Sequence, residues 1–167
     1  MLHCCSCRLH TAIIIYSRWQ TKQATQLAAA GYTTEALEQL QGLNRWPTAT
    51  AHSWFQQAQM LHQTGRPQAA LACLQHCEQR RPNQLTQQLK ADIYTGMGYY
   101  AKAEQCLLTA VYMAPNRLRS KYLLMLHYET TGQPHKARQW RTIILNTPAK
   151  VPSVEATFFR QQAQVLL

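Results

Sequence analysis

Cysteine and histidine side chains are the residues of this sequence that could bind a metal or act as nucleophiles. Near the N-terminus, His3, Cys4, Cys5, Cys7 and His10 supply ligands of the kind that bind zinc. A structural zinc site needs two spaced pairs of such ligands, and only this one short cluster is present. We therefore predict a frayed N-terminus rather than a metal centre, and no cofactor.

The remaining cysteines are predicted to be core residues. Cys73 and Cys77 lie four residues apart on one expected helix, and Cys106 lies on the equivalent helix of the following repeat. Small thiols pack well at such positions and are among the most buried residue types. The even number of cysteines therefore does not require a disulfide framework.

Acidic and histidine residues do not form a recognisable catalytic site. The seven acids are scattered along the chain and none forms a pair. His52 and His62 are ten residues apart, which is roughly 15 Å along a helix and too far for shared metal ligation or proton relay. Phosphate loops, dinucleotide fingerprints and serine elbows are absent from the sequence. We predict that this chain is not an enzyme.

Basic residues outnumber acidic ones by 17 to 7, which gives a formal net charge of +10. The excess is concentrated in residues 101–167, which hold nine Lys or Arg and three acids. A predicted basic patch comprises Arg117, Arg119, Lys121, Arg138 and Arg141. Such a patch favours anionic partners such as lipid headgroups, acidic protein segments or nucleic acid, although a merely solvated face has the same composition.

Four glycines indicate that the chain is built from repeats. Gly31, Gly65, Gly98 and Gly132 fall 34, 33 and 34 residues apart. Each is followed five positions later by an alanine, at residues 36, 70, 103 and 137. A period near 34 is typical of a helix-turn-helix unit that cannot bury its apolar face alone and stacks on its neighbours.

Small and large residues recur in the same order in the two central units. Ala58 and Ala70 are small enough for two helices to approach closely, while Trp54, Leu61 and Leu74 fill the surrounding space. Gln57 is the one residue of the second repeat that departs from this pattern. We predict an all-α, right-handed solenoid with repeats at residues 17–49, 51–83, 84–116 and 118–150.

Two further segments flank the predicted repeats. Residues 1–16 form a leader, and residues 152–167 form a capping helix in which Ser153 caps the N-terminus and Phe158 and Phe159 cover the last repeat. No stretch approaches the roughly 20 apolar residues of a membrane-spanning helix. The run Ala12–Tyr16 is also too short for a signal-peptide core.

The order Trp54, Gln57, Ala58, Leu61, Gly65, Ala70, Leu74, Pro82 resembles the tetratricopeptide repeat. The resemblance implies that the first helices of successive repeats line a groove for an extended peptide or a partner helix. The implied groove residues are Arg18, Thr21, Thr25, His52, Phe55, Gln59, His62, Gln88, Asp92, Arg119, Tyr122 and Leu126. The Lys and Asn residues with which chaperone-binding members hold a terminal carboxylate are absent from this groove. The alternative to a binding groove is an ordinary hydrated face without a resident ligand.

A narrower resemblance covers residues 112–153. The strings Tyr112-Met113-Ala114-Pro115-Asn116-Arg117 and Lys121-Tyr122-Leu123-Leu124, then Tyr128, Thr131-Gly132, Lys136-Ala137 and Lys150-Val151-Pro152-Ser153, resemble the C-terminal repeats of Bacteroidetes O-antigen ligase and polymerase-like membrane proteins. That family places glycosyl transfer in a membrane bundle, which this sequence lacks. The resemblance implies a detached or truncated tail.

Together these patterns predict a non-catalytic scaffold of a surface-polysaccharide system that binds a protein or peptide partner. The chain would be soluble or peripheral at the bacterial inner membrane, with its basic end against anionic headgroups. The alternative is a free-standing helical-repeat protein that binds RNA or another polyanion. Because the groove residues do not recur from repeat to repeat, such binding would come from attraction to phosphate groups and would not recognise particular bases.

Overall fold

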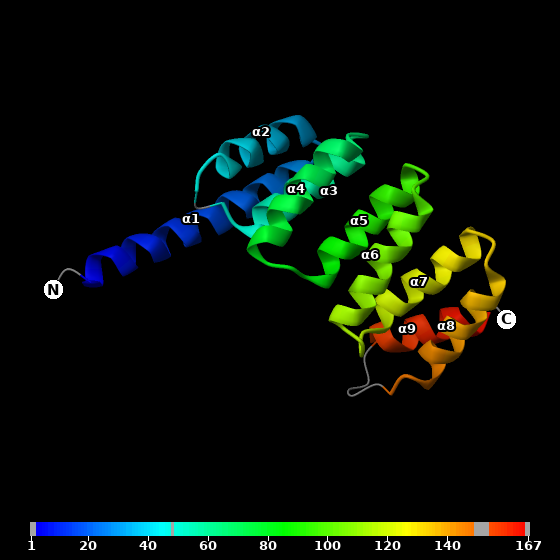
Figure 1. Ribbon diagram of the computed structural model, residues 1–167. Helices are drawn as coiled ribbons and strands as arrows, with labels where there is room; N and C mark the ends of the chain where they lie inside the picture. Colours follow the sequence, from blue (N-terminus) through cyan, green and yellow to red (C-terminus); the bar gives the residue numbers. More distant parts are fainter. Residues whose placement is uncertain (1–2, 48, 149–153, 166–167) are drawn as a thin grey trace. The chain divides into compact units, whose positions relative to one another are not determined.

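The computed structural model describes residues 3–47, 49–148 and 154–165, and the side chains of residues 11–47, 49–148 and 154–164. Nine α-helices and no strand make up this described part (Figure 1). The predicted all-α fold is therefore confirmed. The helices form two compact units, Met1–Pro82 and Asn83–Leu167.

Unit 1 consists of two antiparallel helical hairpins. Helix α1 (His3–Ala29) pairs with α2 (Thr33–Asn44), and α3 (Ala51–Gln63) pairs with α4 (Pro67–Arg80). The hairpins join because α3 packs on both α1 and α2. The leader boundary predicted at residue 16 falls inside α1, which is one continuous helix.

Unit 2 has the same hairpin plan with one additional helix. Helix α5 (Gln84–Gly96) pairs with α6 (Tyr100–Met113), and α7 (Leu118–Thr130) pairs with α8 (Pro134–Asn146). Helix α9 (Val154–Val165) packs against α7 and α8. It begins at the predicted residue, while the predicted N-cap, Ser153, lies outside the described residues.

Each hairpin turns at one of the four spaced glycines. All four have positive φ, between 72° and 94°, a conformation that side chains with a Cβ rarely adopt. At the second hairpin, the amide of Arg66 donates to the carbonyl of Leu61 at 2.8 Å, and at the third that of Tyr99 donates to Tyr94 at 2.8 Å. These bonds close the first helix of each hairpin in the Schellman manner. The glycine spacing therefore marks the helix ends, as predicted.

The predicted small residues lie at the helix crossings. Ala36, Ala58, Ala70, Ala103 and Ala137 are all within 2% of full burial. The predicted core thiols of Cys73, Cys77 and Cys106 are also buried. Burial raises the pKa of the Cys73 thiol to about 11, so it remains protonated near neutral pH.

A polar network accounts for the residue that departs from the repeat pattern. Gln57 is buried, and its side-chain oxygen accepts a hydrogen bond from Asn44 Nδ2 at 2.8 Å. Asn44 Oδ1 in turn accepts from Ser53 Oγ at 2.6 Å, and Ser53 forms a capping box with Thr50 at the start of α3. This network ties the end of α2 to α3, where the repeat pattern would place an apolar contact.

A second network joins three helices of unit 2. The Tyr128 hydroxyl donates to Glu104 Oε1 at 2.7 Å, and Lys136 Nζ lies 3.3 Å from the same oxygen. These contacts lower the pKa of Glu104, while burial and the bond to Glu104 raise the pKa of Tyr128. His127 is buried beside them, and burial lowers its pKa.

Replacing Gln57 by leucine, the residue that the repeat pattern favours, should lower the free energy of unfolding by about 1–3 kcal/mol, because the buried Asn44 amide then loses its acceptor. The double variant Asn44→Leu/Gln57→Leu removes both partners and should recover most of that loss. Urea denaturation measures both changes. A single variant as stable as the parent chain would show that the network contributes nothing.

Stability of unit 2 should fall as the pH is lowered from about 7.5 to 5.5, the range in which an ordinary histidine titrates. The pKa of folded His127 is below its ordinary value of 6.5, so the unfolded chain binds the proton first and acid favours unfolding. The pKa of Glu104 is lowered from its ordinary value of 4.5, so protonation of this carboxylate destabilises the fold only at more acidic pH. Melting temperatures across this range measure the effect.

His127→Phe should flatten this pH dependence, whereas His135→Phe, at an exposed position on α8, should leave it as steep as in the parent chain. Equal flattening by both variants would contradict the assignment to His127.

Candidate functional site

The first helix of the second hairpin presents a partly exposed strip. His52, Phe55, Gln59 and His62 follow one another at helical spacing on α3, while Ala58 faces the core. His52 is exposed, and the other three strip residues are half-buried. We call these four residues the α3 strip. It offers one aromatic surface flanked by polar groups, a composition that suits contact with a peptide.

The predicted groove residues of α1 do not all reach the surface. Thr21 is 0% exposed, and its hydroxyl donates to the carbonyl of Ser17 at 2.7 Å. Thr25 is half-buried and donates to the carbonyl of Lys22 at 2.7 Å, and Arg18 is exposed. Thr21 is therefore a packing residue, because the crossing of α1 with its neighbours needs a small side chain.

In unit 2, a predicted groove residue instead bridges two helices. Gln88 is 8% exposed, and its Nε2 donates to Ser120 Oγ at 2.8 Å, which links α5 to α7. The predicted positions Asp92, Arg119 and Leu126 are exposed. Gln88 therefore does not belong to the exposed face that the sequence predicts.

The second predicted aromatic anchor is covered by the chain itself. The ring of Tyr122 on α7 lies 5.1 Å from that of Phe159 on α9, measured between centroids, and both pack against the core of unit 2. Ala163, which sequence reasoning did not single out, is fully buried on the same helix. Helix α9 caps the last hairpin as predicted, but it does so over the predicted binding position Tyr122.

Two members of the predicted basic patch are internal. Lys121 is buried, its Nζ donates to Thr147 Oγ1 at 2.6 Å, and burial lowers its pKa. Arg141 is 9% exposed and pairs with Glu129 at 2.8 Å. The exposed members are Arg117, Arg119 and Arg138. Unshielded charge in this region is thus smaller than the sequence predicts.

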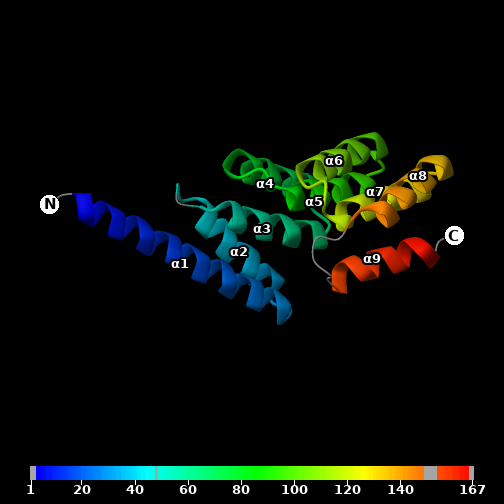
Figure 2. The same cartoon turned by 90° about the horizontal axis from the view of Figure 1, so that it is seen from below.

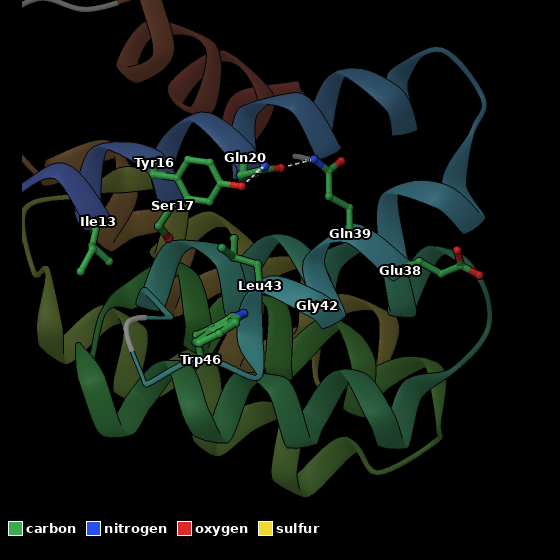
Figure 3. A pocket seen from close by; sticks show the side chains of 9 residues that line it. All are labelled: Ile13, Tyr16, Ser17, Gln20, Glu38, Gln39, Gly42, Leu43 and Trp46. Carbon is green, nitrogen blue, oxygen red and sulfur yellow. Dashed lines mark hydrogen bonds between the residues drawn. The ribbon is translucent and has the colours of Figure 1, made fainter.

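A pocket in the first hairpin is the feature that sequence reasoning missed. It has a volume of about 500 Å³ and lies between α1 and α2 (Figure 3). Ile13 and Tyr16 on one side face Leu43 and Trp46 on the other. The apolar run of residues 12–16 is the feature of the sequence that could have indicated this pocket, but it was considered only as a membrane segment or signal-peptide core. Side chains of the His3–His10 cluster lie outside those described.

No helix within the described ranges is both long and apolar enough to cross a bilayer. A comparison with curated protein sequences finds no significant match. A family model, described as a tetratricopeptide repeat, matches residues 51–84 and 86–117. These two segments overlap the second and third repeats predicted from the glycine and alanine spacing.

Solved structures share the fold at low sequence identity. A MamA structure superposes with a TM-score of 0.69 at 19% identity, over 81% of this chain and 79% of that one. MamA from Desulfovibrio magneticus RS-1 gives 0.66 at 20% identity, over 90% and 84%. YrrB, described as a tetratricopeptide-repeat protein with an unusual peptide-binding site, gives 0.66 at 12% identity, over 85% and 71%. Likeness at these identities concerns the fold alone.

The repeats of residues 51–84 and 86–117, the glycine turns and the shared fold all lead to the same assignment. They support a tetratricopeptide-repeat protein with a helical solenoid fold.

Proposed function

We propose that the chain is a non-catalytic scaffold that binds a peptide or helix of a partner protein along the α3 strip. The observation that carries the proposal is that His52 is exposed, and Phe55, Gln59 and His62 are half-buried, along one helix face of a matched tetratricopeptide repeat. A strip of this kind binds by covering an aromatic side chain and pairing polar groups at its edge.

The composition of the strip indicates the kind of partner. It carries no acidic or permanently basic side chain, so its affinity must come from apolar burial at Phe55 and from hydrogen bonds. A partner segment with an apolar side chain between uncharged polar residues fits this surface. The peptide-binding site ascribed to YrrB supports the use of this fold for such a segment.

The alternative of a polyanion partner is less well supported. It relied on five basic residues acting together, and Lys121 and Arg141 are engaged inside unit 2. Exposed arginines remain at residues 117, 119 and 138, and they can attract anions without specificity. We therefore retain the protein scaffold as the function.

Peptides selected from a random library against the full chain should lose affinity when Phe55 is replaced by alanine. Removal of the one aromatic anchor should weaken binding by about tenfold or more, which corresponds to roughly 1.4 kcal/mol. Isothermal titration calorimetry with a selected peptide measures the change.

Tyr112→Ala provides the matched control, since Tyr112 is an aromatic residue on α6 that is 90% exposed. This variant should bind the selected peptides as the parent chain does. Unchanged affinity in Phe55→Ala, or an equal loss in both variants, would place the binding site elsewhere.

We further propose, from the resemblance of residues 112–153, that the scaffold serves as the C-terminal repeat region of an O-antigen ligase or polymerase-like membrane protein. Such a region would recruit partners to the inner membrane, with its exposed arginines near anionic headgroups. The family-like string overlaps α7 and α8, whose Tyr128 and Ala137 are buried in unit 2. Packing therefore accounts for part of the resemblance, and a cellular test must decide the parentage.

An antibody raised against this chain should detect, in the membrane fraction of the source cells, a protein considerably larger than 19.2 kDa. A band of that mass or less in the soluble fraction, with none in the membrane fraction, would contradict the membrane parentage and leave the peptide-binding proposal intact.

A further inference from the structure

Helix α1 extends beyond α2 at its N-terminal end. Helix α1 has 27 residues and spans about 40 Å, whereas α2 has 12 residues and spans about 18 Å. Figure 2 shows α1 continuing well past the end of α2. Large apolar side chains are exposed where the two helices part: Tyr16 is 57% and Trp46 is 68% exposed. Such side chains in one region indicate a contact surface.

The pocket described above lies at this position. Ile13 and Tyr16 of α1 face Leu43 of α2 and Trp46, and together they give it mainly apolar walls (Figure 3). Its volume of about 500 Å³ is within the range of sites that hold a large side chain or a small ligand. We call it the α1–α2 pocket.

One wall of the pocket carries an ordered polar chain. Gln39 Nε2 donates to Gln20 Oε1, and Gln20 Nε2 donates to the Tyr16 hydroxyl at 2.7 Å. These bonds hold side chains of α1 and α2 in fixed positions. Ser17 also lines the pocket; it is 1% exposed, and its hydroxyl has no hydrogen-bond partner among the described residues. A buried hydroxyl without a partner is costly and can be satisfied by a bound group.

Gly42 lies in the pocket wall, and nothing in the fold requires a glycine there. It is inside α2, its φ is not positive, and a Cβ at this position would meet no atom within 4 Å. A glycine within a helix costs about 0.5–1 kcal/mol relative to alanine. The absence of a side chain leaves open space that a bound partner can enter.

One acidic residue, Glu38, lines the pocket in a chain of net charge +10. Glu35 and Glu38 are the only acids among the first 77 residues, and both are exposed on α2. Glu38 lines the pocket, with its carboxylate at the outer edge in Figure 3. Arg18 and Lys22 are on the opposite side of α1 by helical phase, while Arg45 follows at the C-cap of α2. The border therefore favours a basic partner.

A hairpin of this chain also packs against a single helix. In unit 1, α3 packs on the α1–α2 hairpin, in which Ala36, Leu37 and Leu40 of α2 are buried. In unit 2 the last hairpin accepts a single helix, α9, which inserts Phe159 and Ala163. A hairpin of this chain thus binds one amphipathic helix.

We propose that the α1–α2 pocket binds a basic amphipathic helix of a partner protein. An apolar side chain of that helix enters between Ile13 and Trp46, and a Lys or Arg about one turn away pairs with Glu38 and Glu35. Gly42 admits the close approach of the helix. This site is separate from the α3 strip and goes beyond the function proposed above, because it uses another hairpin and another kind of ligand.

The probe is a fluorescein-labelled model helix of leucine and lysine with leucines at i, i+3, i+4 and i+7. A second peptide has the same leucines and glutamate in place of lysine. Fluorescence anisotropy with the full chain at physiological ionic strength should show that the lysine peptide binds about tenfold or more tightly than the glutamate peptide. Equal affinity for the two peptides would overturn the charge assignment and with it the proposal.

Gly42→Leu fills the pocket and replaces a helical glycine by a good helix former, so it should keep the fold and weaken binding of the lysine peptide by about tenfold or more. Gly96→Leu is the matched control, since Gly96 is also a helical residue with open space around a Cβ, and it lies in unit 2. Thermal unfolding verifies both folds. Undiminished binding in a folded Gly42→Leu variant would exclude the pocket.

Glu35→Lys/Glu38→Lys should reverse the preference toward the glutamate peptide, whereas Glu155→Lys, at an exposed position on α9, should not. Phe55→Ala should leave binding of the lysine peptide unchanged, so the failure of one site is distinguishable from that of the other. Two further outcomes would overturn the partner helix. If light scattering shows that the chain self-associates and that Gly42→Leu abolishes this, the occupant is a second copy of the chain. If the chain binds phosphatidylglycerol vesicles and Gly42→Leu abolishes that binding, the occupant is a lipid.

Discussion

The structure depends on one constraint: a helical hairpin buries only part of its apolar surface and needs a neighbour for the rest. The close contact within each hairpin is made by alanines such as Ala58 and Ala70, which are 0% exposed and leave no space for a larger residue. The contact between hairpins is made by the opposite faces, as where α3 packs on α2. In unit 2, α9 supplies this contact for the hairpin of α7 and α8.

Sequence reasoning recovered the parts of this arrangement that depend on local geometry. The four glycines adopt positive φ because the hairpin turn requires it, and the alanines are buried because the helix crossing requires it. Both requirements apply to single positions at a fixed spacing, so they are visible in the sequence. The same reasoning holds for Cys77 and Cys106, whose size suits a crossing and whose burial was expected.

The polar residues were harder to place, because their environment depends on partners distant in the sequence. Gln88 is predicted to line the groove by its position in the repeat and Lys121 to belong to the basic patch by its charge, yet Gln88 pairs with Ser120 and Lys121 with Thr147. Gln57 was noted as an anomaly, while its partner Asn44 gave no signal because it follows the expected core of α2. A polar side chain predicts exposure only when no distant group can satisfy it. Thr21 adds a simpler case, in which small size outweighs polarity.

Net charge was likewise an incomplete guide to partners. The excess of basic residues suggested an anionic partner, but burial removes Lys121 and Arg141 from the exposed charge of unit 2. In unit 1 the exposed acids Glu35 and Glu38 lie three residues apart on α2, so part of this helix carries negative charge in a chain that is positive overall. Recognition acts over about a Debye length, roughly 8 Å at physiological salt, and responds to such local groups rather than to the total. A chain that is basic overall can therefore attract a basic helix at one local surface.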